Sequence, residues 1–247
     1  MGKVYLTGAG PGDIDLLTIK ALKVVQEANV IIYDRLANHD ILKRAKDGCK
    51  FIYVGKADGK HTLPQDQINE VIYENALKFD TVVRLKGGDP LVFGRGGEEA
   101  KYLKSRGIEY EFIPGVTSAI SVPAYAGIPV THRGVAVSFR VVTGHESPNK
   151  KSSQIDWESM KANETIIFLM GLHNLSNIVN NLMRVGHGGN TPCAVISKGT
   201  TPEQKTVVGT LLNIVKLVED HKLETPALIV VGKVVELRDE LSWFTEN

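Results

Sequence analysis

The densest group of residues that could do chemistry is the segment RLKGGDPLVFGRGGEE, Arg84–Glu99, directly after an apolar run. Glycines at positions 87 and 88 leave the backbone bare, and the Asp89 carboxylate can accept hydrogen bonds from an amine or a hydroxyl. Arg95 and Glu98 fall at the start of the next expected helix. This composition favours close contact with a ligand, and the alternative is a flexible surface loop.

A second glycine-rich loop, GAGPGD, begins at Gly8 and follows the first apolar run. Its spacing differs from the G-x-G-x-x-G pattern that binds dinucleotides. Pro11 lacks the N–H that a phosphate would accept, and Asp13 places a negative charge where the phosphate would lie. Asp13 is also a good helix N-cap. A phosphate site is therefore disfavoured, which leaves a tight turn or a close approach to a neutral or zwitterionic ligand.

A third segment of interest is PGVTSAISVPAYAGIPVTHRG, Pro114–Gly134. Thr117 or Ser118 could cap the helix that its alanine-rich part favours, and free N–H groups there could receive a carboxylate. His132 and Arg133 end the segment, where they are either ordinary surface charges or ligand contacts.

Charges also follow two other apolar runs. Asp34 and Arg35 come after Val30–Tyr33, and Lys56 comes shortly after Phe51–Val54. Each alone is more typical of a loop than of a catalyst, but several strand ends that converge on one face favour a site. Later in the chain, Met170 is more typical of a core and Gly199 of a turn. Met170 ends the apolar run Thr165–Met170, and Gly199 comes two residues after the run Cys193–Ser197.

These residues need a scaffold, and the hydrophobic pattern predicts one. Apolar, β-branched runs alternate with helical patterns, which indicates an α/β fold with mostly parallel or mixed sheets covered by helices. The expected strands of the first half are Val4–Thr7, Val30–Tyr33, Phe51–Val54, Thr81–Leu85 and Glu109–Ile113, with helices at Leu16–Glu27, Asp66–Leu77 and Glu98–Ser105. The expected strands of the second half are Val135–Thr143, Thr165–Met170, Cys193–Ser197, Thr206–Val208 and Ala227–Val231.

The prolines and glycines of Pro114–Gly134 divide these two series, as a hinge or boundary would. We therefore expect two α/β domains, residues 1–114 and 115–247.

Composition limits the class of protein. The chain has 247 residues, 43% hydrophobic and 23% charged, with a formal net charge of +1, which is typical of a globular protein. Nothing global indicates a nucleic-acid or membrane partner, so an anionic ligand would need a local patch. The two cysteines, Cys49 and Cys193, make neither a disulfide framework nor a zinc signature. We expect a cytoplasmic protein without a metal.

The motifs together resemble the tetrapyrrole methylase family over nearly the whole chain. The motifs that carry the resemblance are GAGPGD at 8–13, YDRL at 33–36, YVGK at 53–56, GGDPLVFGRGGEE at 87–99, PGVTSA at 114–119, GIPVTHRG at 127–134 and GTTPEQ at 199–204. YDRL, YVGK and GRGGEE are similar to the members that act on uroporphyrinogen III. No dehydrogenase–chelatase or synthase sequence flanks these motifs, so we expect those activities on other chains.

The resemblance implies two α/β domains with S-adenosylmethionine in a cleft between them, in a homodimer. It implies transfer of two methyl groups to pyrrole carbons of uroporphyrinogen III, which gives precorrin-2 for sirohaem or cobalamin synthesis. The implied catalytic residues are Asp34 as proton acceptor, Lys56 as proton donor and Arg95. The implied cofactor contacts are Pro11, Gly87, Gly88, Asp89, Val92, Thr117, Ser118, Met170 and Gly199. The implied substrate contacts are Arg35, Glu98, His132 and Arg133.

Two other functions remain open from the sequence. One is methylation of a different substrate within the family, either a later precorrin or a protein or RNA, which YDRL and YVGK disfavour. The other is a nucleotide-binding regulatory module without catalysis, which Pro11 and Asp13 disfavour.

Overall fold

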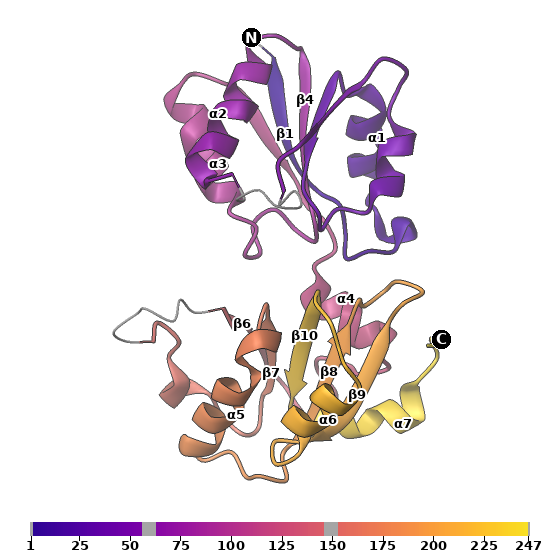
Figure 1. Cartoon of the computed structure of the whole chain (residues 1–247), viewed down its shortest axis with the longest axis vertical. Helices are drawn as coiled ribbons and strands as arrows, with labels where there is room; N and C mark the ends of the chain where they lie inside the picture. Colours follow the sequence, from indigo (N-terminus) through magenta and orange to yellow (C-terminus); the bar gives the residue numbers. More distant parts are fainter. Residues whose placement is uncertain (1, 56–62, 146–152, 247) are drawn as a thin grey trace. The chain divides into compact units, whose positions relative to one another are not determined.

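The computed structural model describes residues 2–55, 63–145 and 153–246, and the chain forms two compact units, Met1–Thr117 and Ser118–Asn247 (Figure 1). The division falls within the stretch Pro114–Gly134, where prolines and glycines interrupt the regular pattern. Each unit contains a five-stranded sheet of its own.

The first unit is built on a fully parallel sheet with strand order β3-β2-β4-β1-β5. Its central strands are buried on both faces and consist largely of β-branched residues, as expected for parallel strands covered by helices. The strands are β1 (Lys3–Gly8), β2 (Val30–Tyr33), β3 (Lys50–Tyr53), β4 (Thr81–Lys86) and β5 (Tyr110–Ile113).

Helices cover the two faces of this sheet in different groups (Figure 1). The apolar stripes of α2 (Gln65–Ala76) and α3 (Gly96–Ser105) pack on one face, around Leu6 and Val82. The stripe of α1 (Ile19–Glu27) packs on the opposite face. The short 3-10 helix η2 (His39–Arg44) covers the same face as α1.

The start of α1 differs from the helix predicted at Leu16–Glu27. A 3-10 helix, η1 (Ile14–Leu16), comes first, and Asp13 caps it by accepting the Asp15 N–H at 2.9 Å. The backbone is then extended at Thr18, whose hydroxyl accepts the Ala21 N–H at 3.1 Å and so begins α1 at Ile19. The predicted helix was wrong in its first turn because two caps in succession compete with a continuous helix.

The second unit contains a mixed sheet with strand order β6-β7-β10-β8-β9. β6 and β7 are parallel, whereas β10 is antiparallel to both of its neighbours and β9 is antiparallel to β8. The strands are β6 (Phe139–Thr143), β7 (Thr165–Leu169), β8 (Pro192–Ser197), β9 (Lys205–Thr210) and β10 (Ala227–Val231). The two sheets confirm the predicted α/β fold with parallel or mixed sheets.

Helices also cover both faces of the second sheet. One face carries α5 (Leu175–Arg184) and α6 (Ile214–Asp220), and the other carries α4 (Ser118–Tyr125) and the 3-10 helix η5 (Lys233–Leu237). The remaining short elements are η3 (Trp157–Ser159), η4 (Leu172–Asn174) and α7 (Arg238–Leu241).

The strand predicted at Val135–Thr143 begins later, at Phe139. The backbone of His132 pairs with that of Ala136 in a tight turn, so the residues from His132 to Ala136 bond to each other and not to the sheet. Among the described residues, no helix is long and apolar enough to cross a membrane.

Candidate functional site

The carboxyl ends of the first unit's strands meet at one edge of the parallel sheet. β1 and β4 are neighbours there, but the helices that follow them, α1 and α3, lie on opposite faces. Such a reversal of connections opens a crevice beyond the strand ends, where α/β proteins bind ligands. The described residues of this unit that the sequence singles out follow those ends, namely Pro11, Asp34, Arg35, Gly87, Gly88, Asp89, Val92, Arg95, Glu98 and Thr117. Lys56 lies outside the described residues.

Four loops, which follow β1, β2, β4 and β5, contact one another through glycines at this edge. Gly88 and Gly10 form a small antiparallel bridge between the loops after β4 and β1. A Cβ on Gly8 would lie 2.5 Å from the Gly115 Cα and 2.6 Å from the Gly88 oxygen. A Cβ on Gly87 would lie 2.6 Å from the Leu36 Cβ. The glycines therefore allow the loops to pack on one another. From the sequence alone, this reason for glycine could not be distinguished from close contact with a ligand.

Asp89 connects two of these loops. Its Oδ1 accepts the Leu91 N–H at 2.8 Å, and its Oδ2 accepts the Gly115 N–H at 3.0 Å. A carboxylate oxygen has two lone pairs, so each oxygen keeps capacity for one further donor. Asp89 thus holds the loop after β5 while it can still accept a hydrogen bond from a ligand.

The segment after Asp89 presents apolar side chains to solvent. Leu91, Val92 and Phe93 are exposed, and Phe93 and Arg95 have positive φ angles of 52° and 58°. Non-glycine residues in this region are strained, and such strain clusters at ligand sites. Hydrogen bonds from the Leu91 N–H to Asp89 Oδ1 and from the Gly96 N–H to the Pro90 oxygen give the segment a defined conformation.

Arg95 and Glu98 form a two-pronged ion pair at the start of α3. Arg95 Nε and Nη2 donate to the two Glu98 oxygens at 2.9 and 2.7 Å. These hydrogen bonds raise the pKa of Arg95 and lower the pKa of Glu98. Both side chains are 55% exposed, so a soluble carboxylate has access to the Arg95 guanidinium.

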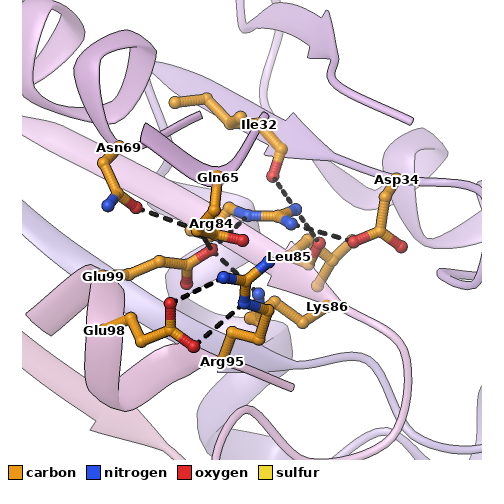
Figure 2. A network of polar contacts seen from close by, with 10 residues as sticks. All are labelled: Ile32, Asp34, Gln65, Asn69, Arg84, Leu85, Lys86, Arg95, Glu98 and Glu99. Carbon is orange, nitrogen blue, oxygen red and sulfur yellow. Dashed lines mark hydrogen bonds and ion pairs between the residues drawn. The ribbon is translucent and has the colours of Figure 1, made fainter. Parts of the chain in front are cut away.

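A buried charged cluster lies beneath this surface (Figure 2). Arg84 and Lys86 are two positions apart in β4, so their side chains point to the same face of the sheet, the one that α2 and α3 cover. The Glu99 Oε1 accepts hydrogen bonds from Lys86 Nζ at 2.9 Å, Arg84 Nε at 3.2 Å and Gln65 Nε2 at 3.3 Å. Arg84 Nη2 also donates to Asp34 Oδ2 at 2.9 Å, which connects the cluster to the strand edge.

The cluster is deeply desolvated. The Glu99 side chain is 0% exposed, and its second oxygen, Oε2, has no hydrogen-bond partner among the described residues. Burial lowers the pKa of Lys86, and the neighbouring Arg84 guanidinium acts in the same direction. The sequence interpretation assigned no role to Arg84 or Lys86. The signal in the sequence was the presence of two cations, two positions apart, in a strand expected to be buried, where such charges need partners.

In the second unit, Met170 and Gly199 follow β7 and β8, whose carboxyl ends share one edge. Met170 is 52% exposed with a φ of 58°, so it is not the core residue that its type first suggested. Gly199 packs against Val122, where an added Cβ would lie 2.3 Å from Cγ1. Lys198 and Thr200, which flank Gly199, also have positive φ angles, of 48° and 64°.

The other polar residues that the sequence singles out in the second unit do not follow β7 or β8. Ser118 is the first residue of α4, and His132 and Arg133 are exposed in the connection from α4 to β6, where His132 Nδ1 lies 2.9 Å from the Arg133 oxygen. Arg140, in β6, bonds to Ser159 and pairs with Glu164 at 3.3 Å. These partners hold β6 to its flanking loop.

The residues at the strand edge fit S-adenosylmethionine better than a phosphate. Pro11 offers no N–H, and both Asp13 and Asp89 would repel an anion. Exposed apolar side chains and a carboxylate with spare lone pairs suit a zwitterionic ligand with a flat apolar part. The described residues contain no group of three or more His, Cys, Asp or Glu side chains placed to hold a metal ion.

Comparison with known proteins then decides the family. The model of the tetrapyrrole (corrin/porphyrin) methylases matches residues 3–215. The chain belongs to this family. As a tetrapyrrole methylase, it is 52% identical over 239 residues to uroporphyrinogen-III C-methyltransferase of Methanocaldococcus jannaschii, with 96% of this chain and 98% of that protein covered.

Solved structures agree with this placement of the methylase. One of uroporphyrin-III C-methyltransferase from Thermus thermophilus is 38% identical with a TM-score of 0.82, over 98% of this chain and 99% of that one. Another, complexed with S-adenosylhomocysteine, is 36% identical with a TM-score of 0.79, over 96% and 94% of the two chains.

Proposed function

We propose that this chain is an S-adenosylmethionine-dependent C-methyltransferase that adds two methyl groups to uroporphyrinogen III and gives precorrin-2. The observation that carries the proposal is the 52% identity, over nearly the full length of both chains, to a uroporphyrinogen-III C-methyltransferase. The geometry at the carboxyl ends of the strands supports it. The Asp89 carboxylate, which has unused lone pairs, and the exposed Arg95 both lie where the connections of the sheet reverse.

S-adenosylmethionine supplies a methyl group already activated on a sulfonium, so the protein needs mainly to align it with an electron-rich carbon. Asp89 accepts a hydrogen bond from the ligand while the glycine-packed loops fix its own position. Val92 supplies apolar contact. The full set that we assign to the methyl donor is Pro11, Gly87, Gly88, Asp89, Val92, Thr117, Ser118, Met170 and Gly199.

Methylation of a pyrrole carbon leaves a proton that must be removed, which calls for one base. Asp34 is our candidate, because its carboxylate is at the strand edge and partly exposed, whereas an arginine stays protonated. We assign proton donation to Lys56.

Uroporphyrinogen III carries eight carboxylates, and arginine binds a carboxylate through two parallel hydrogen bonds. Arg95 pairs with Glu98 through Nε and Nη2, so the Nη1–Nη2 edge of its exposed guanidinium is the one that would bind a propionate or acetate of the substrate. The other exposed groups that we assign to the substrate are Arg35, Glu98, His132 and Arg133.

We further propose that the protein is a homodimer and works in the cytoplasm. Analytical ultracentrifugation and fractionation of the source cells test these two points.

The decisive experiment is incubation with S-adenosylmethionine and anaerobic uroporphyrinogen III, followed by mass spectrometry of the product. We expect a mass increase of two methyl groups, and none when the methyl donor is omitted. Folded protein that adds no methyl group would refute the proposal. Addition of a methyl group to a later precorrin alone would reassign the substrate within the family.

A titration distinguishes the regulatory alternative. We expect S-adenosylhomocysteine to bind and NAD not to bind. Tight NAD binding without S-adenosylhomocysteine binding would instead favour a nucleotide-binding module.

A further inference from the structure

A continuous row of charged side chains runs from the interior of the first unit to its strand edge (Figure 2). Glu99 starts the row in the first turn of α3, Arg84 continues it on β4, and Asp34 ends it directly after β2. The exposed fraction rises along the row, from 0% for Glu99 to 4% for Arg84 and 24% for Asp34. Of the three, Asp34 is the one that can meet a substrate.

Arg84 is held rigidly at the middle of this row. Its Nε bonds to Glu99, its Nη2 bonds to Asp34, and its Nη1 donates to the backbone oxygens of Ile32 and Leu85 at 3.4 and 3.0 Å. The guanidinium is planar, so contacts on all three nitrogens fix its orientation. A lysine at this position would have one nitrogen in place of three, so it could not reproduce these contacts on separate atoms in a fixed plane.

Asp34 is in turn fixed at both oxygens. Oδ2 accepts from Arg84, and Oδ1 accepts the Leu36 N–H at 3.1 Å. The carboxylate therefore cannot turn freely about its bond to the chain, while one lone pair on each oxygen remains available.

Stability alone does not account for this arrangement. Two cations are buried together, and the Glu99 Oε2 has no partner among the described residues. Buried ion pairs can often be replaced by apolar residues without loss of stability. The row therefore has a reason beyond stability, and Asp34 at its exposed end is where that reason would act.

We propose that Arg84, anchored by Glu99, is a positioning residue that fixes the orientation of the Asp34 carboxylate for proton transfer. This inference rests on the proposed function, in which Asp34 accepts the proton. Misplacement of a reacting group by about 1 Å costs roughly 100-fold in rate, so a looser Asp34 would lower turnover without loss of ligand binding.

The test is a double-mutant cycle of Arg84→Lys and Asp34→Asn, with methylation of uroporphyrinogen III read by mass spectrometry and S-adenosylhomocysteine binding read by calorimetry. Arg84→Lys keeps the positive charge of the cluster but loses the planar fork. Lys86→Met is the matched control, since Lys86 is also buried and also bonds to Glu99 Oε1, but it does not contact Asp34 through any hydrogen bond given for the described residues.

We expect Arg84→Lys to lower kcat by about 100-fold, with the KM for uroporphyrinogen III and the Kd for S-adenosylhomocysteine changed by less than about threefold. In the Asp34→Asn background the same change should cost less than about threefold, because the group it positions is already gone. Lys86→Met should couple with Asp34→Asn by less than about threefold, because Lys86 acts on Asp34 through space and not through a hydrogen bond.

Independent effects of Arg84→Lys and Asp34→Asn would overturn the inference, and so would equal coupling of Lys86→Met with Asp34→Asn. Should Arg84→Lys fail to fold by circular dichroism, Glu99→Gln takes its place in the cycle with the same expected coupling. An Asp34→Asn variant with unchanged kcat would overturn the inference but leave the methyltransferase proposal standing. Absence of methylation by the unmodified protein would overturn both.

Discussion

Gly88 donates its backbone N–H to the Gly10 oxygen at 2.7 Å, and Gly10 donates back to the Gly88 oxygen at 3.3 Å. This pair joins the loops that follow two adjacent parallel strands. A side chain on either of two nearby residues, Gly8 at the end of β1 and Gly115 in the loop after β5, would meet backbone atoms, so this close packing requires glycine there. The contact makes the strand edge one structured surface.

The first prediction concerns Gly8→Ala. Its Cβ would lie 2.6 Å from the Gly88 oxygen, so the loops must separate. We expect a loss of about 1–3 kcal/mol in the free energy of unfolding and about tenfold weaker S-adenosylhomocysteine binding. Chemical denaturation and calorimetry measure these two quantities.

Gly97→Ala is the control for this prediction. No heavy atom lies within 4 Å of the added Cβ, and Gly97 is inside α3. Alanine is favoured over glycine in a helix by about 0.5–1 kcal/mol, so this variant should be as stable or more stable. Equal destabilisation by both substitutions would contradict the loop-packing explanation.

The second prediction concerns Arg95→Ala. Because Arg95 is exposed and already shaped around a carboxylate, its loss should lower turnover of uroporphyrinogen III by about 10–100-fold with little change in S-adenosylhomocysteine affinity. Arg184→Ala is the control, since Arg184 makes an ion pair of 2.7 Å with Glu158 at 56% exposure. A cofactor Kd that rises as much as the rate falls would place Arg95 with the cofactor.

The third prediction concerns the pH dependence of stability. Burial lowers the pKa of His187 below its ordinary value of 6.5, and the Met160 backbone and the Glu164 carboxylate offset only part of this effect. Below the ordinary value, the unfolded chain binds a proton at this histidine more readily than the folded chain does. The contribution of His187 to stability is thus fully present above the unfolded pKa and is lost as pH falls through the folded pKa.

The free energy of unfolding of His187→Gln should therefore depend less on pH between about pH 7 and about pH 5 than that of the unmodified protein. Denaturant titrations at several pH values measure this slope. His221→Gln makes the same substitution at an exposed position and is the comparison variant. An unchanged slope in His187→Gln would show that other groups dominate acid unfolding.

The fourth prediction concerns the two cysteines. Cys193 is fully buried and Cys49 partly buried, and burial raises the pKa of both thiols above the ordinary value. Since the thiolate is the reactive form, a disulfide reagent should modify Cys49 slowly and Cys193 only after denaturation. Native Cys49→Ser protein should thus show no reacting thiol, and rapid labelling of that variant would contradict the packing around Cys193.

The strands could be predicted where local composition decides. Val30–Tyr33 and Ala227–Val231 coincide with β2 and β10, because β-branched runs of this length favour buried strands. Strand order was not predictable, because β10 inserts between β7 and β8 through contacts distant in the sequence.

The candidate site shows the same limit. Asp34 and Arg95 could be singled out by their positions after strand ends, since parallel strands bring those ends together. The contacts of Arg84 could not be predicted, because they reach Asp34, 50 positions away, and a glutamate in another helix; its spacing from Lys86 indicated only that the strand carries two cations on one face. Loop packing through Gly8 and Gly115 likewise depends on tertiary contacts that periodicity does not contain.

Because all strands of the first sheet are parallel, the surface at their carboxyl ends is separate from the surface at their amino ends. The two surfaces can be engineered independently. In this unit the loops proposed to bind ligands lie at the carboxyl ends of the strands, whereas the turns at Gly48 and Gly107 precede β3 and β5 at the other end. No heavy atom lies within 4 Å of a Cβ built at either glycine. A fluorescent reporter or an affinity tag inserted beside either turn would therefore report on the folded unit from the edge away from the chemistry.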